Sequence, residues 1–308
     1  MSETLTPGSV RPRLQPMGLG EILDSAIQML RTNLLLFMAI AAVPGIANLG
    51  YGLSRNWLAS HRGAKGAEIS IGIAVILQLV FALAMLIVDA VARGAQCRAA
   101  AQIVTGETVT AQSAYARFRD RVGRMVGLGI LQALYSFWPL ILGAVAWAAA
   151  PNPVGIILFG VSLVCCGPFV ARYALAYPAT AVMDLSASES LRRSEELGRG
   201  FRWKVMWSYV LPLGVLLVVN LGGMELIAWL RPAWGNKIGV LFFWLATENL
   251  WSFAINLVFE PVVWIAVTLA YYDLCVRKEG LDIEQMMEQA GMPPVPAMYP
   301  TDMPAEPR

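Results

Sequence analysis

Charged residues are scarce in this sequence. Only 14% of the 308 residues are Asp, Glu, Lys or Arg, whereas 57% are hydrophobic, and the mean hydropathy is +0.58. A soluble domain carries about 25% charged residues, so this composition excludes an ordinary soluble fold. The formal net charge of +2 and the lack of long runs of like charge give no reason to expect nucleic acid as a partner. The composition therefore predicts a membrane protein.

Histidine and cysteine are equally scarce. His61 is the single histidine, and the four cysteines form no CxxC pair and no set with a histidine. The usual zinc and metalloprotease motifs are therefore excluded, and we expect no metal and no other cofactor. The sequence also lacks a GxSxG motif, paired intramembrane aspartates and a Cys/His dyad. An intramembrane enzyme is consequently the least favoured function, and we predict no catalytic residue.

The two ends of the chain lack the features of membrane spans. Residues 1–16 contain no short apolar stretch followed by a small-residue cleavage site, so we predict a flexible segment rather than a secretory signal. Residues 286–308 are rich in Pro and Met and show no periodicity, which predicts a disordered tail. Residues 17–285 are predicted to form one membrane domain.

What the sequence has in abundance is long apolar runs. About 20 apolar residues in a helix cross a hydrocarbon core of roughly 30 Å. Runs of this length predict an all-α, polytopic membrane bundle with six transmembrane helices. The predicted spans are about 34–53, 69–92, 125–149, 154–171, 203–230 and 250–272. We expect Glu248 and Asn249 to divide the long run 238–272, because it exceeds one crossing. Whether 238–249 is interfacial, re-entrant or part of an extra span is left open.

Amphipathic or polar segments precede the odd-numbered spans. Residues 19–31 place apolar side chains at helical spacing, and residues 109–122 repeat this pattern. A third segment opens with Ser186-Ala-Ser-Glu189, which fits a helix capping box. We expect these segments to be cytoplasmic helices along the membrane surface, and residues 173–183 to continue there. The order of a surface segment followed by a membrane hairpin predicts three repeated units.

The distribution of cations predicts the topology. With six spans, both termini lie on the same side of the membrane. Most of the 23 Lys and Arg residues fall on that side. The cations on the other side are Arg55, Arg62, Lys65, Arg231 and Lys237. The positive-inside rule therefore places both termini in the cytoplasm of a multi-pass protein of the bacterial inner membrane.

Ionisable residues within or beside the spans are the candidate sites. Glu260 lies near the middle of the last span, where a carboxylate is a candidate functional group or a buried structural one that faces the bundle. Asp89 and Arg93 are four residues apart and could pair at the interface, as could Asp273 and Arg277. Candidate partners of Glu260 are the polar residues of the spans, Gln78, Gln132, Asn220 and Asn256.

Arginines gather in the stretch between the fourth and fifth spans. We expect Arg172 to reach the headgroups from the end of its span. Arg192, Arg193 and Arg199 follow in a helical segment and form a candidate face for anionic lipid or for a protein partner.

Several motifs resemble those of a known family. They are GLGEILDSAI and LRTN before the first span, RYALAYPATAV and SASESLRRSEELGRG before the fifth, and YYDLCVRKEG after the sixth. Together they resemble the bacterial glycerophosphoryl diester phosphodiesterase membrane-domain family, six-span proteins that include members of unknown function. The resemblance covers roughly residues 17–285 and implies a membrane bundle.

The resemblance implies no phosphodiesterase activity. In the phosphodiesterases that name the family, a separate soluble barrel follows this region and carries the catalysis, and we expect no room for that barrel here. No catalytic residue is carried over. The sequence also departs from the family motif at Cys275, where the family often has Arg.

Two functions follow as hypotheses. The first is a non-enzymatic bundle of the inner membrane that organises the bilayer, interacts with lipid or binds a membrane or cytoplasmic partner. The alternative is a small transporter or channel that uses the mid-membrane carboxylate of Glu260. A water-accessible cavity around Glu260 would favour the alternative.

Overall fold

The computed structural model describes residues 16–60, 67–116, 118, 121–149, 153–230 and 238–280. Within these ranges the chain forms α-helices and no β-strand, and six helices are long and apolar enough to cross a membrane. The protein is therefore an all-α, polytopic integral membrane protein, as predicted. His61 and the tail 286–308 lie outside the described residues, as does nearly all of the predicted segment 1–16.

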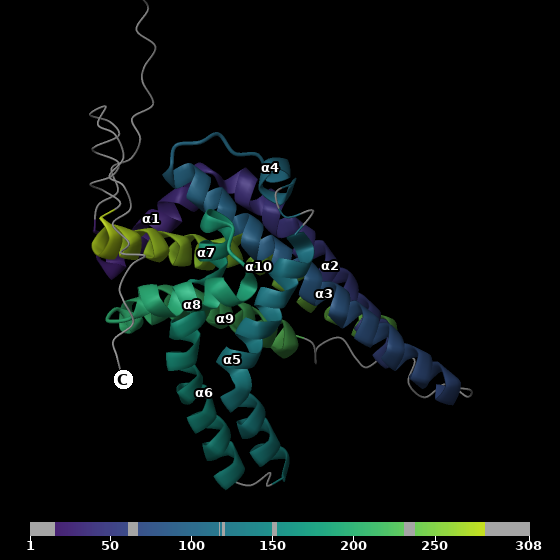
Figure 1. Cartoon of the computed structure of the whole chain (residues 1–308). Helices are drawn as coiled ribbons and strands as arrows, with labels where there is room; N and C mark the ends of the chain where they lie inside the picture. The colour runs from purple at the N-terminus through teal and green to yellow at the C-terminus, as the bar shows by residue number, and fades with distance from the viewer. Residues whose placement is uncertain are drawn as a thin grey trace, which may run out of the picture.

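The six long helices form three hairpins; one short helix precedes each of the first two hairpins, and two short helices precede the third (Figure 1). This order confirms the predicted repetition of the chain. The hairpins are α2 (Leu34–Ser60) with α3 (Ala67–Val104), α5 (Val122–Ala149) with α6 (Pro153–Tyr173), and α9 (Arg202–Leu230) with α10 (Ile238–Glu279). The short helices are α1 (Leu19–Thr32), α4 (Ala111–Ala116), α7 (Ala176–Met183) and α8 (Ala187–Gly198). The first helix of each hairpin contains a buried proline, namely Pro44, Pro139 or Pro212.

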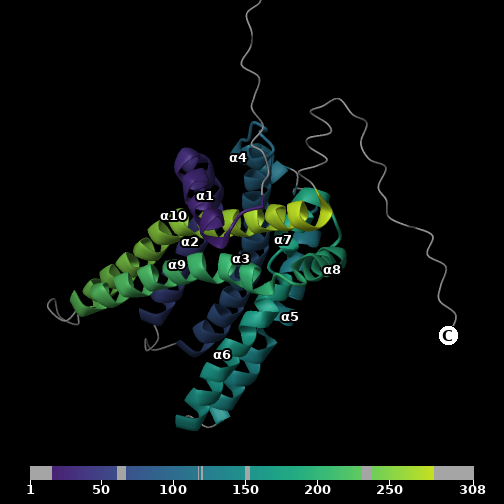
Figure 2. The same cartoon turned by 90° about the vertical axis from the view of Figure 1, so that its left-hand side faces the viewer.

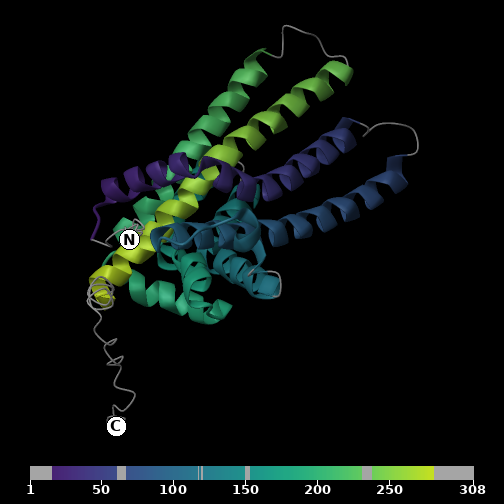
Figure 3. The same ribbon diagram turned by 90° about the horizontal axis from the view of Figure 1, so that it is seen from above.

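The hairpins pack against one another in a ring. Helix α3 packs on α5, α6 on α9, and α10 on α2, so each hairpin contacts both of the others. Away from these contacts the hairpins diverge (Figures 2 and 3). Their outer parts are apolar and exposed, with Leu142 60%, Val164 77% and Val218 72% exposed. Such surfaces are suited to contact with lipid tails.

The hairpins meet in a buried base. We define the base as α1, α7, α8 and the inner ends of α3 (95–104) and α10 (263–276). Many of its residues are alanines, which let helices approach closely, and its largest fully buried side chains include Tyr177 and Tyr271. The apolar face of α1, with Ile22 and Ala26 fully buried, packs here against protein.

Helix α7 corrects the expectation for residues 173–183. These residues were expected on the surface, but residues 174–181 of the chain are fully or almost fully buried. Helix α7 packs against α3, α8 and α10 in the middle of the base. The stretch is apolar because it is covered by protein, not because it lies on lipid.

Helix α10 corrects the expected division at Glu248 and Asn249. It is one helix of 42 residues, roughly 63 Å long at 1.5 Å per residue. The Asn249 amide donates a hydrogen bond of 2.6 Å to the Leu245 carbonyl, so this polar side chain is satisfied within the helix. The extra length is explained by the inner end of α10, which leaves the hairpin and forms the centre of the base.

Candidate functional site

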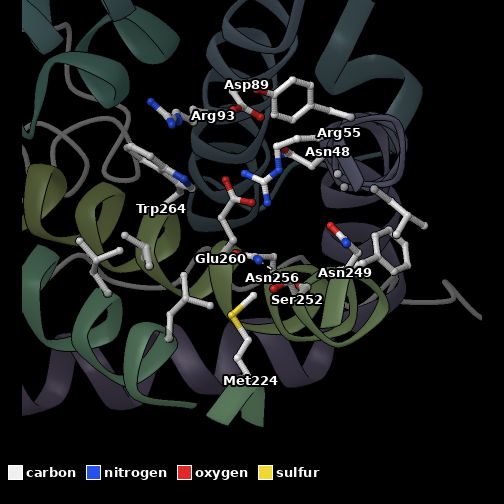
Figure 4. A pocket seen from close by; sticks show the side chains of 18 of the residues that line it. Asn48, Arg55, Asp89, Arg93, Met224, Asn249, Ser252, Asn256, Glu260 and Trp264 are labelled. Atoms are coloured by element: carbon white, nitrogen blue, oxygen red, sulfur yellow. Dashed lines mark hydrogen bonds between the residues drawn. The ribbon is translucent and has the colours of Figure 1, made fainter. Parts of the chain in front are cut away.

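A cavity of about 470 Å³ lies between the first and third hairpins. Helices α2, α3, α9 and α10 line it, and we call it the hairpin cavity. Four charged side chains belong to its lining, Arg55, Asp89, Arg93 and Glu260 (Figure 4). Neutral polar groups join them from α2 and α10, namely Asn48, Asn249, Ser252 and Asn256. A polar cavity among membrane-spanning helices is the strongest candidate for a functional site in the described part of the chain.

Helical spacing brings these side chains together. Ser252, Asn256 and Glu260 are four residues apart and therefore lie on one face of α10. Asp89 and Arg93 share a face of α3 for the same reason. Two short polar faces, one on α3 and one on α10, thus line one cavity.

Two glycines let α2 approach α10 at this cavity. A Cβ atom on Gly45 would lie 2.9 Å from the Phe253 ring, and one on Gly52 would overlap the Asn249 side chain. An alanine at either position would therefore force the Phe253 or Asn249 side chain to move. Gly45, Gly52 and their neighbours Phe253 and Asn249 all belong to the lining of the cavity.

Arg93 is the electrostatic centre of the inner end of the cavity. Its guanidinium interacts with the charges of Glu260 and Asp89. Its Cζ atom also lies 5.5 Å from the centre of the Trp264 ring, within the range of a cation–π contact. Arg93 is therefore the shared counter-charge of two carboxyl groups and also contacts an aromatic ring. Its buried Nε donor has no hydrogen-bond partner among the described residues.

A smaller inner cavity of about 40 Å³ lies beyond Arg93. Arg93, Tyr209 and Trp264 line both cavities, so they separate the two spaces. The inner cavity also contacts Ser136, whose hydroxyl is buried without a hydrogen-bond partner in the described chain. Trp264 packs edge-to-face on Tyr177 of α7, with 5.3 Å between the ring centres. The space is large enough for an ordered water molecule, which would satisfy the Ser136 hydroxyl.

Of the four partners suggested for Glu260, Asn256 lines the cavity with it. Gln78 bonds Ser54, Gln132 bonds the Tyr173 carbonyl, and Asn220 accepts a hydrogen bond from Ser252. Sequence reasoning did not identify Arg55, Asn48, Tyr209 or Trp264 as site residues. The sequence contains one indication of a role for Arg55. It follows Asn48 by seven positions, which is two helical turns, so the two side chains lie on the same face of α2.

The arginines of the predicted basic face are engaged within the protein. Arg193 of α8 pairs with Glu279 of α10, and this pairing raises the pKa of Arg193 despite the opposing effect of burial. Arg192 lies 3.6 Å from Glu196, and Arg199 lies 3.7 Å from Glu195. The larger part of this charge is thus compensated by acids of α8 and α10.

Arg172 also finds a partner in α8. Its Nη2 atom donates a 2.5 Å hydrogen bond to the Glu195 carboxylate. This bond holds the pKa of Glu195 below its ordinary value. The guanidinium also lies 5.5 Å from the centre of the Tyr173 ring. Arg172 therefore connects the end of α6 to α8.

Asp273 and Arg277 form the expected ion pair, with Nε 3.0 Å from the carboxylate. The Asp273 side chain is fully buried and accepts two further bonds, from Lys204 Nζ at 2.6 Å and from the Met17 amide at 2.7 Å. Arg277 and Lys204 also donate to the Met17 carbonyl. This cluster ties the start of α1, the start of α9 and the end of α10 together in the base.

Within the described residues, no group of three His, Cys, Asp or Glu side chains could hold a metal ion. Comparison of the chain with models of known protein families, with curated proteins and with solved structures finds no match. The class of the protein therefore rests on its own structure, a six-span α-helical membrane protein with a charged cavity between hairpins. The resemblance to the phosphodiesterase membrane domain stays a prediction.

Proposed function

We propose that this protein works by binding a polar ligand in the hairpin cavity, as a non-enzymatic membrane protein that interacts with lipid. The observation that carries the proposal is the set of four charged side chains in a cavity among apolar spans. Charged groups at such positions are costly, so they indicate a role beyond anchoring in the bilayer. The positive-inside pattern supports an orientation with both termini in the cytoplasm, with the base on that side.

The basic face of α8 contributes less to this proposal than the cavity does. Its arginines pair with acids of the same protein, so their charge is already partly neutralised. In the described part of the chain, no ion pair within 4.0 Å involves a charged side chain of the cavity. We therefore assign the lipid or ligand contact to the cavity in preference to the surface.

The test is to identify what co-purifies with the full chain in a mild detergent or polymer disc. Native mass spectrometry before and after delipidation should detect a retained molecule, and Glu260→Gln should reduce its retention. The matched control is Glu225→Gln, which removes an exposed carboxylate from α9 outside the cavity. A protein that retains nothing and gains no thermal stability from any added lipid would overturn the proposal.

Transport is the second candidate, and the inner cavity favours it. Arg93, Tyr209 and Trp264 stand between two cavities that lie one behind the other. A barrier of this kind is what a transporter in a closed state requires. Trp264→Ala should then give proteoliposomes a leak to protons or small ions, whereas Trp203→Ala, at an exposed position on α9, should not. Equal permeability of both variants and the wild type would exclude this route.

A further inference from the structure

The charges in the hairpin cavity are balanced but are not paired with one another. Two arginines and two carboxylates line it. Among the described residues, no ion pair within 4.0 Å joins any two of them. In the base, by contrast, Asp273 lies within 3.0 Å of two cationic groups. The cavity is therefore built to leave charges of both signs available to a ligand.

The two signs of charge are arranged unequally in the cavity. Asp89 and Glu260 both interact with Arg93, so the inner end of the cavity offers two carboxyl groups against one guanidinium. Arg55 is exposed, and Figure 4 shows its guanidinium directed into the cavity from α2. The inner end therefore favours an ammonium group, and Arg55 favours an acidic group.

From this arrangement we infer that the hairpin cavity binds a zwitterion that carries a primary ammonium group and a phosphate or carboxylate. The ammonium donates to Asp89 and Glu260, and the acid group accepts from the forked donors of Arg55. Asn256 and Ser252 supply neutral polar groups between the two ends. A purely anionic ligand would face two carboxylates, and a purely cationic ligand would face two arginines.

The apolar outer surfaces of the helices that line the cavity favour an amphiphile as the source of this group. Ile46 of α2 is 62% exposed, and Leu221 of α9 is 57% exposed, on the helices that line the cavity. Acyl chains would contact such apolar surface while the headgroup occupies the polar space. The aminophospholipid headgroup, phosphoethanolamine, has the required chemistry. A free zwitterion has the same chemistry without the chains, and the experiment separates the two.

This inference rests on the proposed function and is tested separately from it. The delipidated full chain in detergent is titrated with phosphatidylethanolamine, phosphatidylglycerol and phosphatidylcholine of the same chain composition, and with soluble O-phosphoethanolamine. Native mass spectrometry gives the bound fraction. We expect phosphatidylethanolamine to bind about tenfold more tightly than either other lipid, because only its headgroup offers both a hydrogen-bonding ammonium and a phosphate.

Three variants locate the binding in the cavity. Arg55→Gln and Glu260→Gln should each weaken binding of phosphatidylethanolamine by about tenfold or more, the effect of losing one charge-assisted hydrogen bond. Glu225→Gln is the control and should leave binding unchanged. Because Arg55 is exposed, its substitution should preserve the fold, which a thermal unfolding curve checks.

Each outcome decides a different point. Equal binding of the three lipids, or selective binding that Arg55→Gln and Glu260→Gln leave intact, would refute the zwitterion site while lipid binding itself stands. No binding of any lipid or of O-phosphoethanolamine would overturn the proposed function as well. Tight binding of O-phosphoethanolamine comparable to that of the lipid supports the zwitterion site and identifies a soluble ligand as its source.

Discussion

The base and the hairpins are built from similar helices but are stabilised in different ways. In five of the six spans, only 11% to 28% of the most apolar 18-residue stretch is buried inside the protein. In α10, which passes through the base, the buried share of this stretch is 50%. Ion pairs and fully buried side chains gather in the base. The hairpins therefore depend on lipid, and the base depends on contacts within the chain. The comparison teaches that apolar composition alone does not separate the two environments.

The largest effect should follow from breaking the ionic cluster of the base. Asp273→Asn leaves Lys204, whose side chain is only 16% exposed, without its buried counter-charge. We expect a loss of about 3–5 kcal/mol in the free energy of unfolding, because an uncompensated buried charge is costly. Denaturant unfolding in detergent micelles measures it.

A matched control for this variant is Glu225→Gln in the third hairpin, which should change stability by less than about 0.5 kcal/mol. The double change Asp273→Leu with Lys204→Met should recover part of the loss, since the more buried cation is removed with the carboxylate and the remaining one, Arg277, has a side chain that is 31% exposed. If Asp273→Asn were as stable as the control, the cluster would not hold the base together.

Two leucines of α5 compare the environments within a single helix. Leu128 is fully buried against the hydrophobic core of the base, whereas Leu142 is 60% exposed in the hairpin. Leu128→Ala should cost about 2–5 kcal/mol through lost packing and a cavity. Leu142→Ala should cost much less, because lipid or detergent refills the space. Thermal unfolding of the two variants in the same detergent measures the difference, and equal losses would contradict the assignment of the two environments.

Neighbouring glycines of α9 test how closely the third hairpin is packed. A Cβ atom on Gly223 would overlap the Trp251 ring, while one on Gly222 would contact nothing within 4 Å. Gly223→Ala should therefore cost about 1–3 kcal/mol by overpacking. Gly222→Ala should be neutral or should stabilise by up to about 1 kcal/mol, since Ala is the better helix former. The reverse order of stability would show that Trp251 moves freely aside.

The smallest expected effect is a pH dependence at the edge of the base. The hydrogen bond from Arg172 lowers the pKa of Glu195 from its ordinary value of 4.5. Its stabilising effect is therefore present above the unfolded pKa and is lost as pH falls through the folded pKa. Between about pH 6 and about pH 3, wild type should lose up to about 1 kcal/mol relative to Glu195→Gln.

Thermal unfolding across this pH range measures the loss. Arg172→Gln should remove most of this pH dependence, because the carboxylate of Glu195 then keeps only the more distant Arg199. A wild-type curve parallel to that of Glu195→Gln would mean that the Arg172 hydrogen bond contributes nothing to stability.

The site was only partly predictable. Glu260 was identified from its depth in an apolar run, and Asp89 and Arg93 from their spacing. Arg55 was assigned to the loop side of its span and was not connected with Glu260, although both line the same cavity. Nothing in the local sequence of α2 says that it packs on α10, a helix nearly 200 residues later. That contact depends on Gly45 and Gly52, whose role is visible only beside Phe253 and Asn249.

The sequence by itself determined the six spans, the three-fold order of short segment and hairpin, and the capping box at Ser186 and Glu189, which the structure confirms. These features follow from the transfer of single residues to lipid and from hydrogen bonds over three positions, so they are local. Only the tertiary structure decided that α7 is buried, that α10 is continuous and that four charges meet in one cavity. These depend on which helices touch, and hydropathy cannot distinguish an apolar helix covered by lipid from one covered by protein.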